Sequence, residues 1–61
     1  MKTDADILDC DLTLRAIRHA CIAGGCEAWA RRDRRSASGL RKVAAKHRRD
    51  AAALLAELVR R

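Results

Sequence analysis

The stretch SASG, residues 36–39, decides the fold, because it is the one polar, flexible interruption in a sequence that otherwise favours helix. The residues on either side are rich in Ala, Leu and Arg, and the chain contains no Pro, Tyr or Phe. A β-domain normally contains more β-branched and aromatic residues. The expected fold is therefore an all-α antiparallel helical hairpin of two long helices, with its bend near 36–39, in a single domain over residues 1–61.

The ends of both helices have recognisable signals. We predict one helix over residues 4–34, which Thr3 or Asp4 caps and the early Asp residues favour through the helix dipole. A second helix is predicted over residues 39–60. Its N-cap is Ser38, with Ser36 as the competing choice.

Heptad spacing predicts which faces of the two helices meet. In the first half a 3-4-3-4 spacing of apolar and small residues begins at Ile7 and Cys10, and the second half has the same kind of spacing from Leu40. Folding the chain at residues 37–38 pairs Ile17 with Leu58 and Ala28 with His47. The predicted hairpin seam consists of Leu14, Ile17, Cys21, Gly24, Ala28, Leu40, Ala44, His47, Ala51, Leu54 and Leu58.

The pair Gly24-Gly25 leaves an alternative open. Each Gly inside a helix costs about 1 kcal/mol relative to Ala, so a turn at this point would give three helices. We favour a continuous helix, because the heptad spacing passes through Gly24 without a change of phase.

Apolar residues that the single hairpin does not cover predict an interface. In this register Leu14 lies opposite Arg61, so residues 4–13 extend beyond the second helix. A further apolar stripe lies off the seam, and exposed apolar surface of this extent usually marks an interface. We expect a homodimer that forms a four-helix bundle, or a different partner protein on the same surface. The predicted interface residues are Ile7, Leu8, Leu12, Ile22, Cys26, Trp29, Val43, Leu55 and Val59.

Charge is distributed unevenly along the chain. The total is +6, but residues 1–11 contain one Lys and four Asp, a net charge of −3, so the remaining residues carry +9. Nine cations fall within residues 31–49, where Asp33 is the only acid. Such a patch favours an anionic partner, either the phosphates of a nucleic acid or an acidic protein surface. The predicted nucleic-acid or anion-binding residues are Arg31, Arg32, Arg34, Arg35, Arg41, Lys42, Lys46, Arg48 and Arg49.

Other kinds of site have weaker signals. Cys21 and Cys26, with Cys10, His19 and His47, offer enough ligand atoms for zinc, but their spacing does not match a zinc motif. We therefore expect no metal and no cofactor, and we interpret His47 as a packed residue of the seam. No nucleophile stands in a recognisable arrangement with a base, and a short hairpin has little room for a pocket, so we expect neither an enzyme nor a small-molecule substrate.

These observations favour a small, non-enzymatic regulatory protein whose basic bend contacts nucleic-acid phosphates. The alternative is a protein-binding inhibitor or adaptor, of the kind that phages and mobile elements encode, which docks on its target through the apolar stripe around Trp29. Three cysteines, an odd number, favour reduced thiols, and the N-terminus is acidic with no long apolar segment. We therefore expect a cytoplasmic protein without a membrane span.

Overall fold

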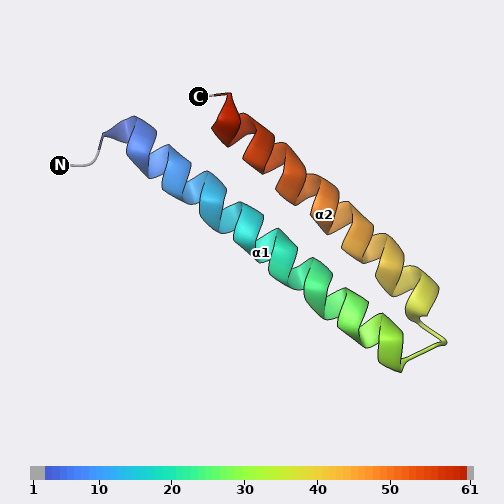
Figure 1. Ribbon diagram of the computed structural model, residues 1–61. Helices are drawn as coiled ribbons and strands as arrows, with labels where there is room; N and C mark the ends of the chain where they lie inside the picture. Colours follow the sequence, from blue (N-terminus) through green and yellow to red (C-terminus); the bar gives the residue numbers. More distant parts are fainter. Residues whose placement is uncertain (1–2, 61) are drawn as a thin grey trace.

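The computed structural model describes residues 3–60 and consists of two antiparallel helices (Figure 1). Helix α1 spans Asp4–Arg32 and helix α2 spans Ala37–Val59. The prediction of an all-α helical hairpin is confirmed. α1 runs without a break through Gly24 and Gly25, neither of which has a positive φ, so the three-helix alternative is wrong. The molecule is a rod with principal extents of 50 × 19 × 10 Å.

A capping box starts α1 at Thr3. The backbone N–H of Asp6 donates to Thr3 Oγ1 at 3.2 Å, and the backbone N–H of Thr3 donates to Asp6 Oδ2, also at 3.2 Å. These two bonds satisfy donors that a helix start leaves without partners, and Asp4 and Asp6 place negative charge at the positive end of the helix dipole. Of the two predicted caps, Thr3 is therefore the correct one.

The bend lies three residues earlier than predicted, at residues 33–36. Asp33 is the cause, because its carboxylate accepts a hydrogen bond from the backbone N–H of Arg35 at 3.1 Å while its own N–H donates to the carbonyl of Trp29 at 2.9 Å. This local side-chain turn ends α1 before the SASG stretch. α2 then begins at Ala37 with Ser36 in the N-cap position, although the Ser36 side chain makes no capping hydrogen bond. The predicted cap Ser38 lies inside the helix.

The contact between the helices is a seam of small residues. On α2 the residues that face α1 are those that the heptad spacing predicts: Ala44 and Ala51 are buried, and Leu40, His47, Leu54 and Leu58 are half-buried. On α1 the facing residues also follow a 3-4-3-4 spacing, but they are different ones. We call this set the inner seam of α1, and it consists of Asp9, Leu12, Ala16, His19, Ala23, Cys26 and Ala30.

The predicted seam of α1 is therefore wrong. Leu14 and Ile17 are exposed by 56% and 52%, Cys21 and Gly24 are exposed, and only Ala28 is half-buried. Residues two positions apart point to opposite sides of a helix, since each residue turns by about 100°, so the bulky heptad stripe lies opposite the inner seam. The predicted pairs change as well: His47 meets His19 and not Ala28. Arg61, expected opposite Leu14, lies outside the described residues.

The resulting core is small for an independent domain. The buried residues are Leu12 and five alanines, and no large side chain in residues 3–60 is completely buried. The accessible surface is 4972 Å², whereas a compact monomer of 6.8 kDa exposes about 4,000 Å². The chain thus exposes more surface than its mass requires. Neither helix, within the described residues, is long and apolar enough to cross a membrane.

Candidate binding surfaces

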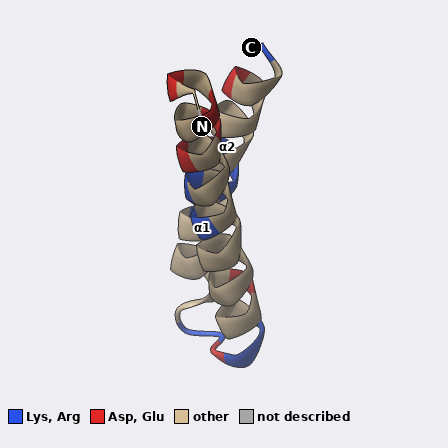
Figure 2. Ribbon diagram, turned by 90° about the vertical axis from the view of Figure 1, so that its left-hand side faces the viewer, with Lys and Arg blue, Asp and Glu red and all other residues tan. Residues whose placement is uncertain are grey.

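Positive charge gathers at the bend, as Figure 2 shows. Arg31 and Arg32 form the last turn of α1, Arg34 and Arg35 lie in the connection, and the remaining five predicted cations follow on α2. All nine side chains are exposed. We call these nine residues the basic bend. The opposite end of the rod contains the acidic start of α1, so the two ends differ in charge (Figure 2).

One of the nine cations is engaged within the chain. Arg48 on α2 forms a two-point ion pair with Glu27 on α1, in which Nε donates to Oε2 at 3.0 Å and Nη2 donates to Oε1. The hydrogen bonds from Arg48 lower the pKa of Glu27, and the same contact raises the pKa of Arg48. Among residues 3–60, Arg48 is the only member of the basic bend that forms an ion pair. The other eight cations face solvent.

Most cations of α2 lie on sides of the helix that point away from α1, whereas Arg48 reaches across to Glu27. Lys42, Lys46 and Arg49 are spaced by four and three residues, which places them on one face of the helix. Arg41 and Arg48, seven residues apart, form a second row. The start of α2 lies between these rows and the loop arginines, and its first turn has no side-chain cap. The arrangement offers cations and a helix start to the same solvent region.

The predicted interface residues divide between the inside and the outside of the hairpin. Leu12 is buried and Cys26 is half-buried in the inner seam, so these two pack within the chain. The other seven are exposed large apolar residues, from Leu8 at 41% to Val59 at 86%, with Trp29 at 60%. Trp29 is the only Trp of the chain and lies one turn before α1 ends.

A continuous apolar stripe follows α1 on the side away from α2. We call it the outer face, and it consists of Ile7, Cys10, Leu14, Ile17 and Cys21, all of them exposed. Their 3-4-3-4 spacing is that of a helix seam, but within this hairpin no second helix covers it. Cys10 and Cys21 lie on this face as free thiols, away from the half-buried Cys26, so the cysteines do not form one cluster.

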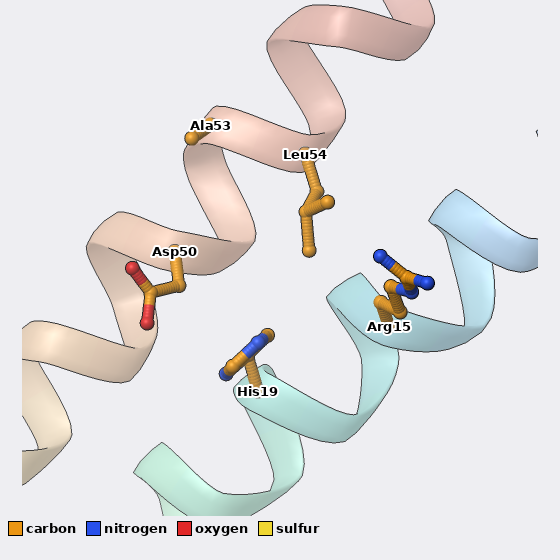
Figure 3. Close-up of a pocket in the computed structure, with 5 residues that line it drawn as sticks. All are labelled: Arg15, His19, Asp50, Ala53 and Leu54. Atoms are coloured by element: carbon orange, nitrogen blue, oxygen red, sulfur yellow. The ribbon is translucent and has the colours of Figure 1, made fainter.

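A polar cluster interrupts the inner seam near its middle. His19 of α1 and His47 of α2 meet with their Nδ1 atoms 2.8 Å apart. Asp50, one turn after His47, borders the same place, where a shallow hollow of about 300 Å³ opens between the helices. Figure 3 shows His19 and Asp50 on facing sides of this hollow, with Arg15 and Leu54 further along it.

The sequence indicates only part of this cluster. His19 and His47 are possible ligands by their residue type, but the prediction groups them with cysteines and not with Asp50. The signal was present in the spacing of His47 and Asp50, which at three residues apart share one face of α2. His19 could not be placed beside them, because that pairing depends on the face of α1 that turns inward.

Comparison with known proteins does not assign this chain. No protein-family model matches it, no curated protein sequence matches it, and no solved structure matches its fold. The function is therefore inferred from three features of the chain itself: the basic bend, the outer face of α1 and the histidine cluster.

Proposed function

We propose that this chain is a non-enzymatic regulatory protein that binds nucleic acid through its basic bend. The observation that carries the proposal is the gathering of nine exposed cations on both arms of one turn, eight of which form no ion pair with any other residue of 3–60. Phosphate binding needs such a patch of Arg and Lys and little else. Arg supplies six of the eight, and its planar guanidinium matches the geometry of a phosphate.

The local structure at the bend supports the same partner. The first turn of α2 has no side-chain cap, and it begins directly after Arg34 and Arg35, where the N–H of Ala37 donates to the carbonyl of Arg34 at 3.4 Å. Helix starts attract anions through their backbone N–H groups and the helix dipole. Trp29 is the one aromatic residue, so stacking on successive bases has no series of rings to use. We propose binding that follows phosphate charge and not base sequence.

Fluorescence anisotropy with labelled duplex DNA and duplex RNA, titrated over salt, tests the proposal. We expect a Kd of about 10 μM or tighter at physiological salt, and a slope of log K against log salt of about −3 to −5, as for four or five neutralised phosphates. The double variant Arg34→Glu/Arg35→Glu should weaken binding at least about tenfold and flatten this slope.

A matched control separates the bend from net charge. Arg18→Glu/Arg60→Glu makes the same change in charge at exposed positions outside the basic bend, so its binding should stay close to that of the parent. Equal losses in the two variants would mean that only the overall charge attracts the nucleic acid. Binding that disappears in the parent at physiological salt would remove the proposal.

We also propose that the acting form is a homodimer of four helices, in which the outer faces of the two α1 helices pack against each other. The hairpin exposes about 1,000 Å² more than a compact monomer of its mass, which is close to the area of a small specific interface. The two ends of one chain differ in charge (Figure 2), so an antiparallel arrangement of the two α1 helices brings the acidic start of each towards the basic end of the other. Lys42, Lys46 and Arg49 belong to α2, outside the outer face, and stay available to phosphates.

The molecular mass in solution tests whether the chain is a dimer. Light scattering should give twice the chain mass for the parent and the single chain mass for Leu14→Lys/Ile17→Lys. The control Ala52→Lys/Ala56→Lys adds the same charge on exposed positions of α2 and should remain dimeric. A monomeric parent would contradict the dimer and would leave the outer face free.

A second candidate function rests on that outcome. If the parent is monomeric, the exposed outer face and Trp29 favour an inhibitor or adaptor that docks on an acidic protein surface, with the basic bend steering the encounter. Trp29→Ala should then abolish binding to that protein while the helix content measured by circular dichroism is unchanged. If the Trp29→Ala variant binds that protein as tightly as the parent does, this second function is excluded.

A further inference from the structure

The most unusual contact in the hairpin is the meeting of two imidazole rings inside its seam. His19 comes from α1 and His47 from α2, and the ring centroids are 5.0 Å apart with the rings tilted by 32°. Both rings present the same atom to each other, Nδ1, at 2.8 Å. The two side chains are half-buried between layers of Ala and Leu. Packing alone does not require two histidines at this position.

A third ligand-bearing group completes the cluster. Asp50 lies three residues after His47, so both side chains leave α2 on the same side. One ligand atom from each of His19, His47 and Asp50 lies within 4.8 Å of the other two. The aspartate makes no hydrogen bond or ion pair within the described chain. Figure 3 shows it opposite His19 across the hollow.

We propose that His19, His47 and Asp50 form a binding site for a divalent transition metal, of which Zn²⁺ is the representative. Two imidazoles and a carboxylate are a ligand set that zinc, cobalt, nickel and copper accept, whereas magnesium and calcium prefer oxygen ligands alone. Both Nδ1 lone pairs and one Asp50 oxygen bind the ion. The fourth position of a tetrahedral site is filled by water from the open hollow.

The two Nδ1 atoms need to move apart slightly to bind a metal ion. Zinc binds each imidazole nitrogen at about 2.0–2.1 Å, so two such nitrogens in a tetrahedral site are about 3.3 Å apart. The Nδ1 atoms at 2.8 Å need to separate by about half an ångström, which rotation of the two side chains supplies. Without the metal, one Nδ1–H donates to the other Nδ1, so the same atoms remain satisfied.

The surrounding charges permit a cation at this position. Arg15 borders the hollow, but its guanidinium is engaged by Asp11, with Nε and Oδ2 3.1 Å apart. Arg48, next to His47 in the sequence, is paired with Glu27. These two cations therefore have acidic partners of their own. The unpaired carboxylate of Asp50 is the charge that the metal meets.

The site would join the two helices across a core that is mostly alanine. A ligand that binds the folded chain and not the unfolded one stabilises the fold in proportion to its affinity. At 100 times its Kd, Zn²⁺ should raise the Tm of this 61-residue chain by about 10 °C or more. This site acts on the hairpin itself and does not depend on nucleic-acid binding.

Isothermal titration of metal-free protein with ZnCl₂ and circular dichroism melting with and without Zn²⁺ test the proposal. We expect one Zn²⁺ per chain with a micromolar Kd, a Tm rise of the stated size, and no comparable rise with Mg²⁺. Asp50→Asn should weaken binding at least about tenfold, within the loss known for changes around metal sites. Glu57→Gln, which neutralises an exposed acid outside the cluster, should bind as the parent does.

The three free cysteines are the competing ligands, and two readouts separate them. The variant Cys10→Ser/Cys21→Ser/Cys26→Ser should bind Zn²⁺ with unchanged affinity, and the Co²⁺ complex of the parent should show no thiolate-to-metal charge-transfer band. His19→Ala and His47→Ala should each abolish binding, and the Co²⁺ spectrum of the parent decides the ligand type even if these variants fail to fold. Loss of binding in the cysteine variant, a thiolate band, or no heat of binding in the parent overturns the proposal.

Discussion

The two opposite faces of α1 follow the same heptad spacing but contain side chains of different size. The inner seam is mostly small, with Ala16, Ala23 and Ala30 buried against α2. The outer face has the bulky residues, and Leu14 and Ile17 are more than half exposed. Small residues allow the two helices to approach closely, while the larger apolar area, which a self-sufficient domain buries, faces outward. This difference is the reason for proposing that a second chain covers the outer face.

Enlarging a side chain of the inner seam should have the largest effect. Ala23 is completely buried, and Ala23→Leu should destabilise the hairpin by about 3 kcal/mol because the added atoms have no space between the helices. Ala20→Leu, on an exposed position of the same helix, should change stability by no more than about 0.5 kcal/mol. Urea unfolding followed by circular dichroism measures both. Equal effects of the two variants would show that the inner seam is not closely packed.

Shortening a side chain of the outer face should have the next largest effect. In the proposed dimer Ile17 is covered by the second chain, so Ile17→Ala should cost about 2 kcal/mol and the Tm of the parent should rise with protein concentration. On a free surface the same change would cost less than about 0.5 kcal/mol. Thermal melts at several concentrations decide between these values, with Ala23→Leu as the reference for a loss inside one hairpin.

The sequence allowed much of the fold to be predicted, because the relevant signals are local. The hairpin, the continuity of α1 and the facing residues of α2 all follow from helical composition and a single heptad stripe. The spacing did not predict which face of α1 contacts α2, because two stripes of α1 have the same period. The stripe with Leu14 and Ile17 is the more apolar of the two, so it was the expected contact face. The contact with α2 is in fact made by Ala16 and Ala23, because small side chains allow the two helices to approach closely. Heptad spacing contains no information about this approach.

The errors in the site have the same origin. The bend begins at Asp33 because that side chain accepts the N–H of Arg35, a bond that competes with the signal of the SASG stretch. This shift and the rotated face of α1 together bring His19 to His47. The basic bend, in contrast, depends only on cations that are consecutive or nearly so in the chain, so its position could be predicted from the sequence.

Substitution of Gly24 and Gly25 tests whether a second helix packs against the end of the outer face. A Cβ added at Gly24 or Gly25 meets nothing within 4 Å, and both residues have ordinary helical φ. Gly25→Ala should therefore stabilise the chain by about 1 kcal/mol, the difference in helix propensity. Gly24 continues the heptad spacing of the outer face, so a second helix packed there should reduce the gain from Gly24→Ala. Equal gains measured by urea unfolding would indicate that no helix approaches Gly24.

The smallest expected effect belongs to the ion pair that joins the two helices outside the seam. Arg48 holds the pKa of Glu27 below its ordinary value of 4.5, so this pair stabilises the fold above that pH and the contribution is lost as the pH falls through the lowered pKa. Glu27→Gln should therefore be slightly less stable than the parent at pH 7, and the difference should shrink towards zero in acid. Both partners are exposed, which keeps the effect small. Urea unfolding at neutral and acidic pH measures it, and a difference that does not change with pH would mean that the charge of Glu27 contributes nothing and that its packing accounts for the loss.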